Sequence, residues 1–291
     1  MRILFLITIV FLFFKTEACD GCNISTGFIN IDPVNYFSFR HRNIQYDGEE
    51  IPFFRHSGGG GELHENFINY EFVAKYFVIK NIFFQTFISM KQTIISSEDI
   101  DETTRGFSDP IFLIGYQKFD VFKKWQLNYS FFGGCDIGIG RYETKLDEEY
   151  SPGSKTTDLL MGSEFLARFS KWAIISKSNY KIGYENKHGY RFGQTVNSSI
   201  YGGYYHEKGN FITLPLLGFS FESDFIDYNN SQSVKFSCSD IFFADIGLNL
   251  MLNRKFVFGT KYKIPVFKNV PGWSDVKLNS FEFEMSIVIG D

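Results

Sequence analysis

Apolar residues recur at every second position along many short segments of the chain, and no helical repeat of 3.6 residues is sustained anywhere. In segment 277–289, apolar side chains alternate with polar ones, so that Phe281, Phe283, Met285, Ile287 and Ile289 oppose Glu282, Glu284 and Ser286. A period of two places each set on one face of a β-sheet. The pattern therefore predicts strands that are apolar on one side and polar on the other.

Twelve segments of this kind follow one another after residue 34, and each is long enough to cross a bilayer as a tilted strand. They span residues 35–46, 66–77, 82–94, 109–119, 125–142, 157–169, 172–185, 190–205, 211–227, 239–252, 255–268 and 277–289. A soluble β-sandwich or lipid-binding β-protein would also alternate. The length of the runs and the number of apolar residues favour an all-β fold, an up-and-down antiparallel transmembrane β-barrel of about 12 strands.

The connections between these segments alternate in length. Those after even-numbered segments are short turns at Val78–Asn81, Asp120–Lys124, Ser170–Lys171, His206–Asn210 and Asn253–Arg254. Most of the others are long and polar, at Asp47–Glu65, Ile95–Ser108, Glu143–Thr156, Tyr228–Cys238 and Lys268–Val276, whereas Asn186–Gly189 is short. Outer-membrane barrels have short periplasmic turns and longer extracellular loops, so the alternation favours a barrel over a sandwich.

Composition agrees with this interpretation. Aromatic residues make up 19% of the 291 residues, yet the mean hydropathy is only −0.11, because apolar and polar positions alternate. The net charge is −4 and no basic block occurs, which argues against a nucleic-acid partner.

The N-terminus predicts export. Met1-Arg2 precedes the apolar run 3–14, and Ala18 ends a stretch typical of a secretory signal peptide, which we assign to residues 1–18. The run is too short for a membrane anchor. A lipoprotein signal would make Cys19 the modified residue. Residues 19–34 then form a Cys-containing segment, periplasmic or plugging the lumen, and 35–291 form the barrel in the cell outer membrane.

The phrase Thr104-Arg105-Gly106-Phe107-Ser108-Asp109-Pro110, together with the signal and the Cys-rich mature start, resembles Gram-negative outer-membrane barrels of the transporter kind. It is most similar to the family associated with the meta pathway of phenol degradation, in which Gly-x-x-Asp precedes a strand, as Gly106 and Asp109 do here. The resemblance implies a Bacteroidota-like source, membrane lipid and the barrel-assembly machinery as partners, and a transported small solute. The chain departs from many such barrels by ending in Ile289-Gly290-Asp291 rather than in an aromatic residue.

Few residues suggest chemistry other than transport. Cys19 and Cys22 form a CxxC pair whose interpretations are a disulfide or a copper or zinc site, although two thiolates supply only two of four ligands. Cys135 and Cys238 could pair with each other or stand alone. His56 and His64 share a long loop that is best explained as solvated. No catalytic motif is present, so we expect neither an enzyme nor any other cofactor.

The facing pattern places charged side chains toward the lumen of the predicted barrel. They either line a solute path or form an ion-pair network that closes it. Two functions follow: a transporter or channel for a small or hydrophobic solute, or a non-transporting structural or binding barrel. The lumen-facing candidates are Arg40, Arg42, Glu71, Lys75, Glu164, Arg168, Lys177, Lys181, Glu222, Asp224, Asp245, Lys261, Lys263, Glu282 and Glu284.

Mass spectrometry of protein purified from membranes tests the N-terminal interpretation. We expect a mature chain beginning at Cys19, with Cys19 and Cys22 bonded to each other or to a soft metal. A diacylglyceryl mass on Cys19 would identify a lipoprotein instead. Two freely alkylated thiols without metal would eliminate both the disulfide and the metal site.

Overall fold

The computed structural model describes residues 34–50, 62–97, 101–122, 124–142, 150–234, 237–271 and 273–289. The predicted signal peptide at 1–18, Cys19, Cys22 and His56 lie outside the described residues and remain predictions.

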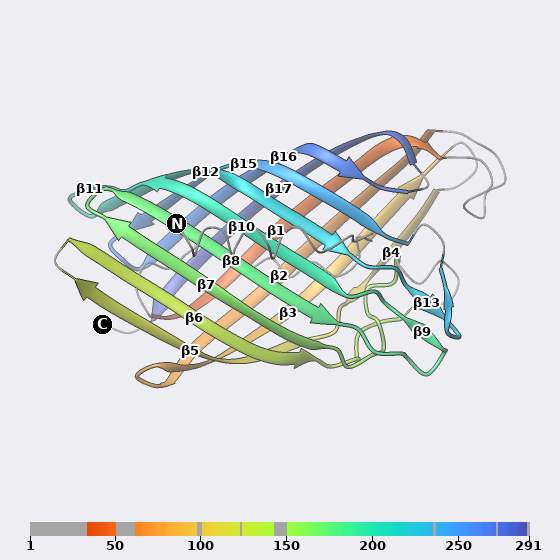
Figure 1. Ribbon diagram of the computed structural model, residues 1–291, viewed down its shortest axis with the longest axis horizontal. Coiled ribbons are helices and arrows are strands. Elements are labelled where there is room, and N and C mark those ends of the chain that lie inside the picture. Colours follow the sequence, from red (N-terminus) through yellow and green to blue (C-terminus); the bar gives the residue numbers. More distant parts are fainter. Residues whose placement is uncertain are drawn as a thin grey trace, which may run out of the picture.

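Long strands make up the wall of the molecule (Figure 1). The long strands are β1 (Asn35–Glu50), β2 (Glu62–Ile79), β3 (Ile82–Ser96), β5 (Ile111–Phe122), β6 (Trp125–Asp136), β7 (Leu159–Phe169), β8 (Trp172–Ile182), β10 (Thr195–Tyr204), β12 (Phe211–Asp224), β15 (Ser239–Leu252), β16 (Phe256–Asn269) and β17 (Trp273–Ile289). The short strands are β4 (Asp101–Phe107), β9 (Tyr190–Arg191), β11 (His206–Lys208), β13 (Tyr228–Asn229) and β14 (Gln232–Ser233). Of the short strands, β4, β9, β13 and β14 lie at one end of the barrel and β11 lies at the other (Figure 1).

Within the described residues, the long strands form one closed antiparallel barrel of twelve strands. Each long strand pairs with the long strands before and after it in the chain. β10 thus pairs directly with β12, although the short β11 lies between them in the sequence. Pairing of β1 with β17, from Asn35↔Ile289 onward, closes the ring. All twelve predicted strands are present, and the predicted fold class is confirmed.

The predicted strand boundaries were wrong where the chain leaves the wall. The expected loop 95–108 contains β4, which pairs with the C-terminal half of β3. β5 pairs only with the N-terminal half of β3, from Ile82↔Tyr116 to Phe87↔Ile111. Pro110 separates β4 from β5; it has no N–H to donate to a ladder, so one continuous strand is broken there. The strand expected from residue 190 begins only at Thr195, because Tyr190 and Arg191 form β9 of the small sheet. The strand expected to end at 227 ends at Asp224, and residues 225–227 connect it to β13 of the same small sheet.

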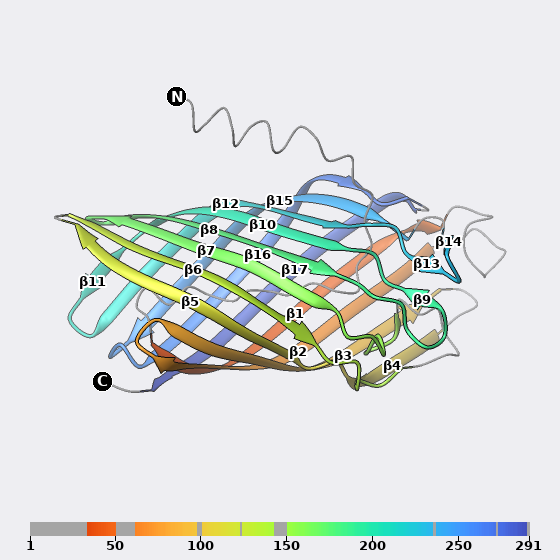
Figure 2. The same ribbon diagram turned by 60° about the horizontal axis from the view of Figure 1, so that its bottom comes forward.

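Turns and loops lie at opposite ends of the barrel (Figure 2). At one end are tight turns, in which Ser170, Asn253 and Arg254 adopt positive φ, as hairpin turns of two residues require. The other end carries β4, residues 137–142 and 150–158, and the small sheet. No helix among the residues described here is long and apolar enough to cross a bilayer.

Successive side chains along the strands alternate between the interior and the outer surface. Along β15, Asp245 is 1% exposed, whereas its outward neighbour Ile246 is 55% exposed. The outer surface is apolar over most of the wall, and Trp125 and Trp172 both lie directly after turns, where an aromatic belt meets the headgroups. Such a surface is stable only in contact with lipid.

Because β12 has one face toward lipid and one toward the lumen, we expect a new charge to impair assembly on the first face and to be tolerated on the second. Phe219 is 49% exposed on the outer surface, so Phe219→Arg places a cation in lipid, at a cost of about 2–4 kcal/mol near mid-membrane. Ser220 faces inward, with its Oγ 3.0 Å from Asp245, so Ser220→Arg meets a counter-charge. We expect heat-modifiable folded protein, measured by gel mobility in outer membranes, to be lost for Phe219→Arg and retained for Ser220→Arg. The reverse result would mean that β12 faces the other way.

Candidate functional site

The interior of the barrel carries the charged side chains that the alternation singled out. Twelve of the fifteen candidates are buried, and Glu164, Arg168 and Lys261 are half-buried. Every one of them lies on a barrel strand. The contacts below show which of them the fold brings together.

Arg40 on β1 joins two neighbouring strands. Its Nη1 is 3.0 Å from Oε2 of Glu71 on β2, and its Nε is 3.2 Å from Oε2 of Glu284 on β17. The other oxygen of Glu284 accepts hydrogen bonds from the hydroxyls of Ser38, at 2.5 Å, and Ser286, at 2.8 Å. Both carboxylates are thus compensated by the one guanidinium.

A second group lies beside the first. Nη2 of Arg42 is 3.0 Å from Oε2 of Glu222, and its Nε is 3.6 Å from Oε1 of Glu282. Lys261 contacts Glu282 at 2.6 Å, while Lys263 contacts both Glu222 and Glu282. We call these five residues, with Arg40, Glu71 and Glu284, the ion-pair layer. It holds four cations and four carboxylates and has no net charge.

The contact between Arg42 and Glu222 crosses the lumen. Arg42 is on β1 and Glu222 on β12, and β17, β16 and β15 lie between them in the wall. Four strand spacings of about 4.8 Å amount to about 19 Å along the wall, too far for two side chains to bridge except through the interior. The ion-pair layer therefore braces the barrel internally.

Lys75 is bound differently. Its Nζ donates to Oε1 of Gln117 at 2.7 Å and lies 3.9 Å from the ring centroid of Phe83, and Gln117 donates in turn to Asn128 at 2.9 Å. Lys75 is thus held by a neutral amide and an aromatic face among the described residues. Inward-facing Gln117 and Asn128 were missed by the sequence analysis, although they alternate with apolar residues in the same way.

The remaining inward charges form local pairs. Lys177 lies 3.5 Å from Glu164, and Lys181 lies 2.9 Å from Asp136 and 2.7 Å from Asp158. Neither Asp136 nor Asp158 was among the candidates.

Three further candidates have other surroundings. Asp245 accepts hydrogen bonds from Tyr201 at 2.7 Å and from Ser220, and the Arg168 guanidinium stacks on the Tyr205 ring at 3.5 Å. Asp224 is buried at the loop end of β12.

Several inward polar groups find no hydrogen-bond partner within the part of the chain that is described. They are the amide of Asn249 and the hydroxyls of Ser130, Thr195 and Ser280. Buried polar groups in proteins are almost always hydrogen-bonded, to protein or to water. These four groups therefore offer hydrogen-bonding positions that water could fill.

Apolar side chains occupy the interior on either side of the ion-pair layer. At the loop end, the cluster consists of Ile44, Tyr46, Leu63, Ile95, Tyr150, Ile241, Phe243 and Leu278. At the turn end, it consists of Leu166, Ala173, Ile175, Tyr201, Tyr205, Ile212, Leu214 and Leu216. A molecule passing through the lumen would meet apolar walls, then charges, then apolar walls again.

The segment between β6 and β7 folds onto the loop end through one buried carboxylate. Asp109 accepts hydrogen bonds from the backbone N–H of Gly140 at 2.7 Å and from the N–H and hydroxyl of Ser154. Tyr150 from the same segment donates its hydroxyl to Glu65 at 2.5 Å inside the barrel. Asp109 stood out in the sequence only through its family phrase, and its partners could not be read from spacing.

The described residues do not test the predicted disulfide or metal site at Cys19 and Cys22, which stays a prediction. No group of three or more potential metal ligands occurs among the described residues. Nδ1 of His64 pairs with Asp47 at 2.7 Å, and Glu65 is engaged by Tyr150. Cys135 is a free thiol, so it is not bonded to Cys238.

The ion-pair layer predicts unequal effects for two glutamates. Glu222→Gln leaves Arg42 and Lys263 with less compensation inside the barrel, and breaking a buried pair costs about 3–5 kcal/mol. Glu207 pairs with Arg254 at 3.0 Å on the exposed turn rim, so Glu207→Gln should cost at most about 1 kcal/mol. Urea unfolding of the reconstituted protein measures both. Equal losses would show that the layer does not brace the fold.

Comparison with known proteins gives the fold. No protein-family model and no curated protein matches the chain. Among solved structures, an outer-membrane channel from Pseudomonas putida F1 is 9% identical with a TM-score of 0.68, covering 92% of this chain and 100% of that one. The β domain of the Bordetella autotransporter Brka is 9% identical with a TM-score of 0.50, covering 88% and 100%. The chain thus has the fold of an outer-membrane β-barrel, as its sequence predicts.

Proposed function

We propose that the protein is an outer-membrane transport barrel that passes a small solute with an apolar body through its lumen. It acts by binding and guiding the solute and not by catalysis. Its immediate partners are membrane lipid and the barrel-assembly machinery.

Two observations carry this proposal: inward-facing polar groups that have no hydrogen-bond partner among the described residues, and the balanced ion-pair layer. A barrel that served only as a scaffold would gain most by filling its interior with apolar side chains, because buried ion pairs rarely stabilise a protein relative to well-packed hydrophobic residues. Here charged groups face the interior instead, together with polar groups that find no partner in the described part of the chain. Such an interior suits a hydrated path.

The solute class follows from the two apolar clusters that flank the layer. An apolar body would be stabilised at both ends of the path, while a polar or charged group would be matched at the centre. The Pseudomonas putida neighbour is described as a channel, which supports the proposal by its fold alone. Membership of the phenol-degradation family rests on the phrase at Gly106 and Asp109 and remains part of the proposal.

A second function is favoured by one specific contact. The bridge between Arg42 and Glu222 crosses the lumen, and a permanent bridge would close the barrel. The protein would then be a structural or binding barrel whose N-terminal Cys19 and Cys22 form a disulfide or hold copper or zinc.

Solute entry into proteoliposomes distinguishes the two functions. The vesicles contain a fluorescent dye, and 4-nitrobenzoate, a small aromatic anion that crosses lipid slowly, is added outside as a quencher. We expect the wild-type barrel to accelerate quenching over protein-free vesicles. Arg42→Gln removes a cation from the layer, so it should slow entry of this anion several-fold.

Glu207→Gln, on the exposed turn rim, is the matched control and should leave the entry rate unchanged. Folded protein is verified for each variant by its gel mobility before and after heating. If the wild type and Arg42→Gln both match empty vesicles while remaining folded, the transport function is rejected and the closed barrel is retained.

A further inference from the structure

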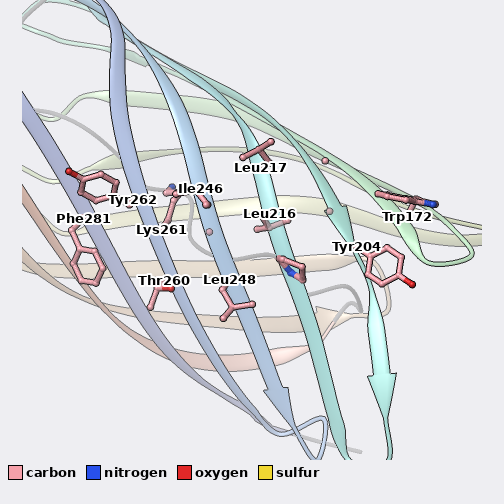
Figure 3. A pocket seen from close by; sticks show the side chains of 14 residues that line it. Trp172, Tyr204, Leu216, Leu217, Ile246, Leu248, Thr260, Lys261, Tyr262 and Phe281 are labelled. Carbon is pink, nitrogen blue, oxygen red and sulfur yellow. The ribbon is translucent and has the colours of Figure 1, made fainter.

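The outer wall of the barrel is hollowed over β10, β12, β15 and β16, on the side that faces lipid. The groove encloses about 680 Å³, within the range of ligand pockets, and is lined mainly by apolar side chains (Figure 3). Trp172 and Tyr204 stand at one end of it, and Tyr262 and Phe281 at the other.

The strand register explains why a groove forms here. One row of outward residues runs across five strands through Gly202, Leu217, Ile246, Tyr262 and Phe281, which are successive partners. Gly202 has no side chain, and a Cβ built on it would meet only the carbonyl oxygen of Leu217, at 3.9 Å. The row is therefore open at its β10 position.

A second row of outward residues runs parallel to the first and lies nearer the turn end of the barrel. On β10, its member is two residues after Gly202. The second row passes through Trp172, Tyr204, Pro215, Leu248 and Thr260. Pro215 and Thr260 are short, so the space between the rows stays unfilled. From Trp172 on β8 to Phe281 on β17 the groove crosses five strand intervals of about 4.8 Å, so it is about 24 Å long and narrow.

One end of the groove carries a positive charge at the level expected for headgroups. Lys171 lies in the turn between β7 and β8, next to Trp172, and its Nζ is 5.9 Å from the Tyr204 ring centroid. The Trp172 and Tyr204 rings contact each other at 5.2 Å between centroids. Trp and Tyr side chains gather where the hydrocarbon meets the headgroups, and the turn end of such barrels is the periplasmic one.

We propose that this groove binds one glycerophospholipid of the periplasmic leaflet, with an acyl chain between the two rows and the phosphate at Lys171. The groove opens into hydrocarbon, so its occupant must be apolar along most of its length. The ammonium group of Lys171 at its headgroup end favours an anion there. A second copy of the chain would need a broad complementary face, whereas this groove is long and narrow and has its charge at one end.

Native mass spectrometry of the full-length protein in detergent, with dioleoyl phosphatidylglycerol added, tests the proposal. We expect one bound phospholipid per barrel, and about fivefold weaker binding when dioleoylglycerol, which lacks the phosphate, replaces it. Gly202→Phe fills the open position of the row and should abolish binding. Lys171→Gln should weaken binding about fivefold, the contribution of one cation near anionic lipid.

Gly133→Phe on β6 is the matched control for Gly202→Phe. Gly133 also faces outward, and its nearest contact for a Cβ is the carbonyl oxygen of Leu160 at 3.6 Å, but it lies outside the groove. This variant should bind lipid like the wild type, and both variants should keep their heat-modifiable mobility. The proposal is overturned if folded Gly202→Phe retains the lipid, if both phenylalanine variants lose it equally, or if Gly202→Phe instead dissociates a dimer.

Discussion

Closure of the sheet is the constraint on which the rest of this structure depends. Hydrocarbon offers no hydrogen-bond partner, so every backbone N–H and C=O within the membrane must be paired inside the protein. Pairing of β1 with β17 and of β10 with β12 achieves this in the described wall, because every long strand then has a paired neighbour on both sides. Once the wall is closed, alternation forces every second side chain inward.

That inward set determines what the barrel can do. A twelve-stranded wall encloses more space than its own side chains fill by simple packing, and here the space contains charges that compensate one another across it. Each cation of the ion-pair layer lies within 4 Å of a carboxylate from another strand. The same contacts that make burial of these charges tolerable also make them a neutral zone through which a solute would have to pass.

The sequence was sufficient for everything that depends on a period of two. All twelve strands and the burial of twelve charged candidates follow from alternation within single segments, because a strand shows its two faces without reference to its neighbours. The sequence was insufficient where the partner of a strand or side chain depends on strand register or on how a loop folds. Neither the pairing of β4 with β3 nor the hydrogen bonds of Asp109 to Gly140 and Ser154 has a local signal. The bridge from Arg42 to Glu222 depends on which strands oppose each other across the lumen.

The bridge between Arg42 and Glu222 also constrains the order in which the barrel forms. The two residues are 180 positions apart, so their contact belongs to the slowest class of folding event, which must wait for most of the chain. Until β12 is in place, Arg42 lacks this carboxylate. The first strand thus carries a charge that gains Glu222 only with β12 and Glu282 only with β17, which favours completion of the ring over half-built sheets.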